Sequence, residues 1–200
     1  MKRLLVTILV ASCGGGDDSQ AQSDAAVDGA GSGSADASID GSQMGAFTLT
    51  SPTFTEGGMI AMANTCDGGN TSPQLGWTGN SMNAMGFAVV LTDKTFNNLR
   101  HWVIYDIPGN LTGLPANVEK VYAPTNVAGA HQTLSYQNVR GYLGPCPPQG
   151  GGPHTYEFAV YGVDVATLPG TAMGTTAAQV VPIITMHQTA TAKLTGTYMR

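Results

Sequence analysis

The sequence predicts a mainly β protein: an antiparallel β fold with one short helix near the C-terminus. Three observations predict it. Apolar runs of strand length, rich in β-branched and aromatic residues, alternate with clusters of Gly, Pro and Asn. Gly occurs 27 times and Pro 11 times in 200 residues, a composition that disfavours long helices. Only one segment, late in the chain, has the apolar spacing of a helix.

The strands are expected from residue 46 onward. The first follows the alternating Phe-Thr-Leu-Thr at residues 47–50, which ends at Ser51-Pro52. The helix is expected over residues 175–188, where Pro182 must lie in the first turn or kink the helix. The segment 108–141 is expected to be irregular and at the surface, where binding residues tend to collect. The remaining strands are expected over residues 84–93, 101–107, 154–164 and 193–198.

Residues 1–12 have the organisation of a bacterial export signal. Lys2 and Arg3 precede the apolar run 4–11, which is far shorter than the roughly 20 residues that a membrane-spanning helix needs. The following Ser12-Cys13 completes a sequence that resembles the lipobox of bacterial lipoproteins. This resemblance implies that Cys13 is lipidated and becomes the new N-terminus, which anchors the protein in the cell envelope outside the cytoplasm. The alternative is an ordinary secretory signal that is cleaved elsewhere.

Residues 13–45, which begin with the lipidated cysteine, are expected to form a flexible acidic linker. Of the 32 residues in 14–45, 26 are Gly, Ala, Ser or Asp, and none is Lys or Arg. Six aspartates here supply most of the net charge of −5, so the domain at 46–200 is nearly neutral. With only 10% charged residues and no cluster of Lys and Arg, the chain is not expected to bind nucleic acid.

Two histidines begin strong strands and are the first candidates for a site. In the first of these strands, a period of two predicts that His101 shares a face with Val103, Tyr105 and Ile107. In the second, His154 and Tyr156 are neighbours on one face, about 6.5–7 Å apart. The loop 141–150 between the strands contains three Pro and three Gly residues, and such a loop can form a wall of a small cavity.

Several motifs occur together in a fixed order. They are Thr65-Cys66-Asp67-Gly68, Ser72-Pro73, the octapeptide 101–108 (HWVIYDIP), the segment 141–148 (GYLGPCPP), His154-x-Tyr156 and Gly196-Thr197-Tyr198. Together they resemble the motifs of the phosphatidylethanolamine-binding protein family, in its bacterial branch of Raf-kinase-inhibitor-like proteins, over about residues 47–200. The resemblance implies a sandwich of antiparallel sheets with a pocket for a small anion, such as phosphate or a phosphorylated headgroup, and no cofactor.

The resemblance also implies which residues form the pocket. His101 and His154 correspond to the pocket histidines, with Tyr156 as the neighbouring aromatic residue. Cys146 and Pro147 fall in the loop from which the family offers backbone contacts. Asp93 stands at the family's Asp-Pro-Asp motif, but Lys-Thr-Phe follows it here, so that one carboxylate and both prolines are missing. Thr155 likewise stands where Arg or Lys is common.

These residues indicate a binding protein and not an enzyme, because no recognisable nucleophile elbow or phosphate loop is present. Imidazoles and a tyrosine hydroxyl can donate hydrogen bonds to an anion. One alternative is a metal hydrolase in which Asp93, His101 and His154 are the ligands. Another is an inhibitor of a protease or a kinase that acts through protein–protein contact.

Once Cys13 carries lipid, Cys66 and Cys146 are the only cysteines left. An even number of cysteines in an exported protein makes a disulfide between them possible. The alternative is that both are small buried side chains near the pocket, since both lie in motifs that cytoplasmic relatives share. The pairing requires Cα atoms no more than about 7 Å apart.

Overall fold

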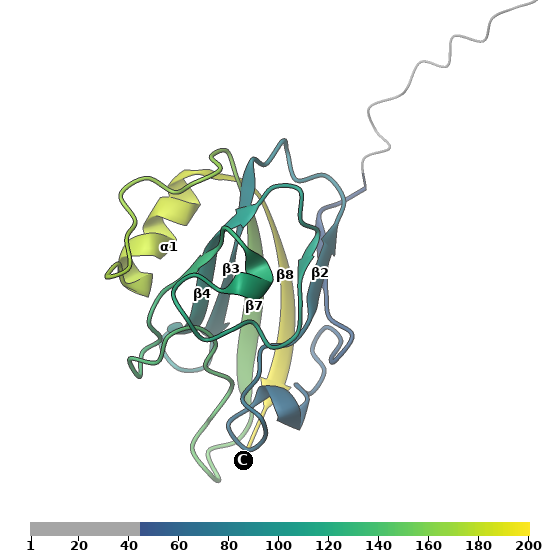
Figure 1. Cartoon of the computed structure of the whole chain (residues 1–200). Helices are drawn as coiled ribbons and strands as arrows, with labels where there is room; N and C mark the ends of the chain where they lie inside the picture. The colour runs from purple at the N-terminus through teal and green to yellow at the C-terminus, as the bar shows by residue number, and fades with distance from the viewer. Residues whose placement is uncertain (1–44) are drawn as a thin grey trace, which may run out of the picture. The chain divides into compact units, whose positions relative to one another are not determined.

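Two antiparallel sheets pack face to face in the computed structural model, which describes residues 45–200 (Figure 1). The larger sheet has the strand order β6-β4-β3-β7-β8, and the smaller has the order β1-β2-β5. The predictions for residues 1–44, including the export signal, Cys13 and the linker, lie outside the described residues. The strands of the larger sheet are β3 (Gly86–Asp93), β4 (Leu99–Pro108), β6 (His131–Gln132), β7 (His154–Val163) and β8 (Gln188–Tyr198). Those of the smaller sheet are β1 (Thr48–Thr50), β2 (Leu75–Thr78) and β5 (Gly113–Leu114).

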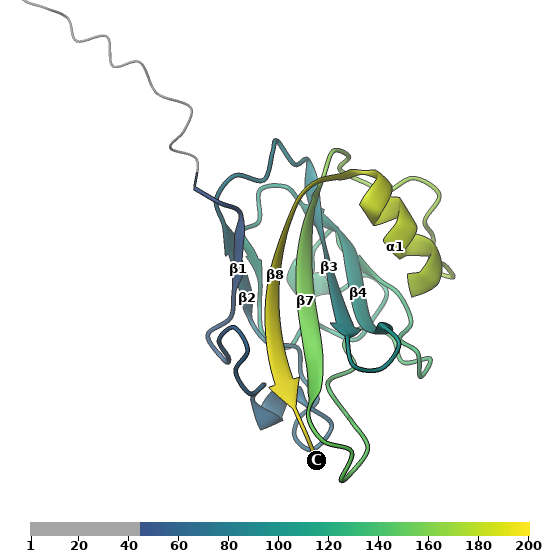
Figure 2. The same cartoon turned by 180° about the vertical axis from the view of Figure 1, so that it is seen from behind.

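The larger sheet is buried on both faces. One face packs against the smaller sheet through Trp77, Phe87, Trp102 and Phe158, and the other is covered by the helix α1 (Ala177–Met186). Figure 2 shows α1 on one side of this sheet and β1 and β2 on the other. Because both faces are covered, every residue of β3 is buried, which explains why its sequence is a nearly continuous apolar run.

The predicted mainly β fold is confirmed, and the helix occupies the core of the expected segment. Thr176 caps α1 together with Gln179, and Pro182 lies beyond the first turn, inside the helix. The sequence did not predict β2, β5 and β6, nor the 3-10 helices η2 (Met62–Asn64) and η3 (Thr125–Val127). No helix within residues 45–200 has the length and apolar character needed to cross a membrane.

Two irregularities in β4 overturn the predicted face of this strand. Leu91 pairs with Trp102 whereas Thr92 pairs with Arg100, so His101 is an extra residue in a bulge. A second shift near Asp106, whose φ is 56°, turns Ile107 into the core between the sheets. Val103 and Tyr105 instead face α1, so the prediction that His101, Val103, Tyr105 and Ile107 share one face is wrong.

The C-terminal end of β8 is covered on its outer edge by the segment 57–60. The N–H of Ile60 donates to the carbonyl of Thr197 (2.9 Å), and the N–H of Thr197 donates to the carbonyl of Gly58 (2.8 Å). Gly196 allows this close approach, because a Cβ at that position would lie 2.6 Å from the side chain of Ile60.

Candidate functional site

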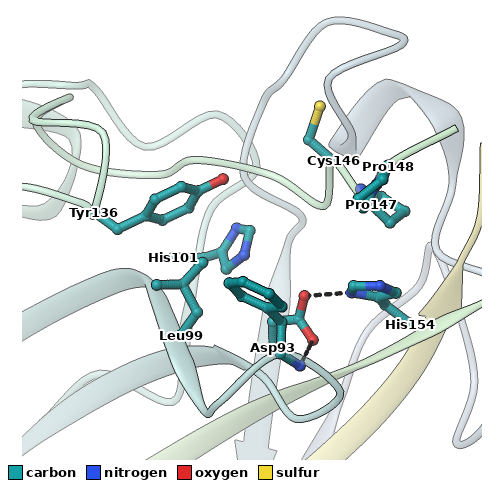
Figure 3. A pocket seen from close by; sticks show the side chains of 9 residues that line it. Asp93, Leu99, His101, Tyr136, Cys146, Pro147, Pro148 and His154 are labelled. Carbon is teal, nitrogen blue, oxygen red and sulfur yellow. Dashed lines mark hydrogen bonds and ion pairs between the residues drawn. The ribbon is translucent and has the colours of Figure 1, made fainter. Parts of the chain in front are cut away.

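A cavity of about 170 Å³ opens where β3 ends and β4 and β7 begin. Five of the six predicted site residues line it, namely Asp93, His101, Cys146, Pro147 and His154. The sixth, Tyr156, lies beside the two histidines. The remaining lining residues are Phe96, Leu99, Tyr136 and Pro148 (Figure 3).

Asp93 holds His154 in a fixed orientation. One carboxylate oxygen, Oδ1, accepts the backbone N–H groups of Thr95 (2.9 Å) and Phe96 (3.0 Å), and so closes the turn after β3. The other, Oδ2, lies 2.6 Å from Nδ1 of His154. A carboxylate in this position accepts a hydrogen bond from the N–H at Nδ1, which leaves Nε2 as the ring nitrogen of His154 that can meet a ligand.

His101 enters the cavity because of the bulge in β4. Its Nδ1 lies 3.1 Å from the carbonyl oxygen of Leu143, and this acceptor places the proton of the neutral ring on Nδ1. Burial lowers the pKa of His101, with the hydrogen bond to Leu143 opposing that effect. The ring is therefore neutral near pH 7 and, like His154, has Nε2 available.

Tyr156 connects the two imidazoles. Its ring contacts His101 edge-on at 5.4 Å between centroids and stacks with His154 at 6.3 Å. Burial, together with the charge of Asp93, raises the pKa of Tyr156, so the hydroxyl stays protonated. Within residues 45–200 this buried hydroxyl has no hydrogen-bond partner, which leaves a donor beside both histidines.

The wall formed by residues 142–148 is tied to the segment 64–70. Cys146 forms a disulfide with Cys66, with Cα atoms 5.4 Å apart, which satisfies the geometric requirement that the sequence left open. The Cys146 sulfur points away from the imidazoles, so this residue faces the cavity with its other atoms (Figure 3). The N–H of Gly144 donates to the side chain of Asn70 (2.7 Å), and a Cβ at Gly144 would lie 2.3 Å from a backbone oxygen. This wall is therefore rigid and closely packed.

The sequence did not predict the apolar rim of the cavity. Phe96 and Leu99 are the ends of a tight turn, in which the N–H of Leu99 donates to the carbonyl of Phe96 (2.9 Å). The two central residues of this turn, Asn97 and Asn98, have φ angles of 49° and 54°. Tyr136 comes from the irregular segment 108–141, where the sequence predicted binding residues without naming any. Its ring contacts that of His101, with 5.0 Å between the ring centroids. Phe96 is 56% exposed and Tyr136 is 39% exposed.

The structure gives the metal alternative no support. Within residues 45–200, no three His, Cys, Asp or Glu side chains are grouped so that they could hold a metal ion. Asp93 and His154, two of the three ligands that this alternative needs, bond directly to each other.

Comparison with known proteins identifies the family. The sequence model of the family described as "Phosphatidylethanolamine-binding protein" matches residues 50–199. YbcL of Escherichia coli is 30% identical over 164 residues, which cover 78% of this chain and 89% of YbcL. LppC of Mycobacterium tuberculosis, which is named as a candidate lipoprotein, is 33% identical over 154 residues, or 76% of this chain and 71% of LppC.

Solved structures agree with the sequence relatives. The crystal structure of YbcL, described as a member of the mammalian PEBP family, superposes with a TM-score of 0.72 at 30% identity and covers 78% of this chain and 99% of YbcL. A homologue from Chlamydia trachomatis superposes with a TM-score of 0.65 at 28% identity and covers 78% of this chain and 98% of its own. The chain therefore belongs to the phosphatidylethanolamine-binding protein family.

Proposed function

We propose that this protein binds a small anion, phosphate or a phosphorylated headgroup, in the cavity between His101 and His154. The observation that carries the proposal is that both imidazoles are fixed through Nδ1 at one cavity, His101 by a carbonyl and His154 by Asp93. Nε2 of each ring is thereby left for a ligand and donates to an anion once the ring is protonated, whereas the hydroxyl of Tyr156 is a donor without protonation.

The electrostatics of the cavity predict that anion binding draws in protons. Among residues 45–200, no Lys or Arg lines the cavity, and the carboxylate of Asp93 is engaged by two backbone N–H groups and by Nδ1 of His154. His101 is neutral before binding, because burial lowers its pKa. A bound dianion favours the protonated imidazole, so affinity rises as the pH falls.

The test is calorimetric titration with phosphate, repeated with sulfate because sulfate does not itself titrate near neutral pH. His101→Ala and His154→Ala should each weaken binding by about 1–3 kcal/mol, the range for losing a hydrogen bond to a charged group. His187→Ala is the matched control, since His187 pairs with Asp164 (2.7 Å) and does not line the cavity. Equal phosphate affinity in all three variants would remove the assignment.

We further propose that the protein is held in the bacterial cell envelope by lipid on Cys13. The support is the order of Lys2-Arg3, apolar run and Cys13 in the sequence, together with the name of the relative LppC. The full-length chain should sediment with membranes, and Cys13→Ala should appear in the soluble fraction. A wild-type protein that is fully soluble after export would contradict the anchor.

A further inference from the structure

A second, larger cavity of about 450 Å³ adjoins the first one. Leu99 and Tyr136 line both cavities and form the boundary between them. None of the Asp and Glu residues in the part of the chain that the structure describes lines the second cavity. Its other lining residues come from the turn after β3, the loop that carries Tyr136 and the beginning of α1, namely Asn97, Asn98, Arg100, Leu134, Ser135, Asn138, Thr176, Ala177 and Ala178.

Arg100 and His101, which are consecutive residues of β4, line different cavities. The bulge directs His101 into the first cavity and leaves Arg100, which pairs with Thr92, in the second. Arg100 donates one hydrogen bond, to the hydroxyl of Thr92, and no carboxylate within residues 45–200 pairs with it. Because Leu99 and Tyr136 line both cavities, one small molecule that passes over them can reach both Arg100 and His101.

Three asparagines give the second cavity its chemical character. Asn97, Asn98 and Asn138 all have positive φ angles, between 49° and 58°, so each occupies a tight turn. No hydrogen bond within residues 45–200 engages their side-chain amides. An amide both donates and accepts, which suits hydroxyl groups that do the same, and the Tyr136 ring adds an apolar surface at the boundary.

We propose that the second cavity is a subsite for the sugar of a sugar phosphate whose phosphate occupies the His101–His154 cavity. This inference rests on the proposed anion binding. Arg100 and the asparagine amides would bond to sugar hydroxyls, while the sugar passes over Leu99 and Tyr136. The larger volume of the second cavity fits the larger part of such a ligand.

The experiment compares glucose 6-phosphate, phosphoethanolamine and inorganic phosphate by calorimetry on the wild-type protein. Glucose 6-phosphate should bind about tenfold or more tightly than inorganic phosphate, the gain from one or two additional hydrogen bonds. Phosphoethanolamine, which has no hydroxyl-bearing sugar, should lack this gain.

Glycine variants remove the amides without disturbing the turns, because glycine accepts positive φ. The combined Asn97→Gly, Asn98→Gly and Asn138→Gly variant should lose the gain for glucose 6-phosphate and keep its affinity for inorganic phosphate. Asn117→Gly is the matched control, since Asn117 has φ 56° and lines neither cavity.

The outcomes separate this inference from the proposed function. The sugar subsite alone is overturned if the protein binds inorganic phosphate but binds glucose 6-phosphate no more tightly. It is also overturned if the triple variant still binds glucose 6-phosphate more tightly than inorganic phosphate. Failure of both inorganic phosphate and glucose 6-phosphate to bind overturns both proposals. A gain shared by phosphoethanolamine would assign the second cavity to a headgroup amine and not to a sugar.

Discussion

Two aspartate–histidine pairs in this protein have nearly the same local geometry and different surroundings. In both, a buried aspartate bonds to Nδ1 of a histidine, at 2.6 Å for Asp93–His154 and 3.0 Å for Asp106–His131. The His154 side chain is 11% exposed and lines the cavity that also contains His101. The His131 side chain is 30% exposed and stacks on Tyr122, with 4.6 Å between ring centroids.

The remaining carboxylate oxygen shows what each pair does for the fold. In Asp106 it accepts the N–H of Leu168 (2.8 Å), which ties the segment after β7 to β4. In Asp93 it closes the turn after β3. Both pairs therefore stabilise local structure, and the histidine–aspartate bond alone does not make a site. The Asp93 pair is a candidate site because a second oriented imidazole and an open cavity lie beside it.

The largest expected effect concerns the Cys66–Cys146 disulfide. Cys146 lines the same cavity as the Asp93–His154 pair, and this cavity does not include the Asp106–His131 pair. Cys66 and Cys146 are separated by 80 residues in the sequence. On the chain-entropy account, closing such a loop contributes about 4 kcal/mol to the free energy of unfolding. Reduced protein and the Cys66→Ser/Cys146→Ser variant should lose this amount in urea titrations. They should also bind phosphate more weakly than the oxidised protein, since Cys146 and Pro147 form part of the cavity wall. Identical urea midpoints for the oxidised and reduced forms would show that the disulfide contributes nothing.

A smaller loss of stability should separate the two aspartates. Asp106→Gly keeps the positive φ of this position and removes the carboxylate, which leaves the N–H of Leu168 without its acceptor. The free energy of unfolding should fall by about 2 kcal/mol with no change in phosphate affinity. Asp93→Gly should lower both quantities. If Asp106→Gly weakened phosphate binding as much as Asp93→Gly, the distinction between a structural pair and a site pair would be wrong.

The smallest effect is a dependence of stability on pH. Because burial lowers the pKa of His101 in the folded protein, the unfolded chain binds more protons in the window between the lowered value and about 6.5. His101 therefore makes stability rise with pH across this window, and acidification destabilises the fold. Urea midpoints measured across the window should show a shallower slope for His101→Gln than for wild type, and phosphate should offset the acid-induced loss. Equal slopes for the two proteins would contradict a buried, neutral His101.

Unbroken strands were the part of the fold that the sequence could predict. His154 and Tyr156 share a face as expected, because β7 keeps a regular register with β3 from Asp93 to Gly86. His101 was placed on the wrong face because a bulge adds one residue, and a period of two carries no signal for it. The short strand β2 was missed since its four residues, Leu75–Thr78, include a glycine and show no sustained alternation.

The rim and the second cavity depend on contacts that sequence spacing does not encode. Tyr136 lies 35 positions from His101 in the chain, and only the folding of the loop brings the two rings together. Asn97-Asn98 indicates a tight turn, but no local pattern places this turn beside α1. His101 was a candidate because it begins a strong strand, whereas motifs specific to the family were what led to Cys146 as a site residue.

The covered edge of β8 has a consequence for how copies of this protein meet one another. An uncovered outer strand offers a row of N–H and carbonyl groups to which a second molecule can add its own strand. Here the segment around Gly58 and Ile60 already occupies those groups at Thr195 and Thr197. The opposite edge of the sheet, β6, is only two residues long. Within residues 45–200, the covered end of β8 and the short β6 offer little free strand at these two places, so a second copy held close by cannot extend the sheet there.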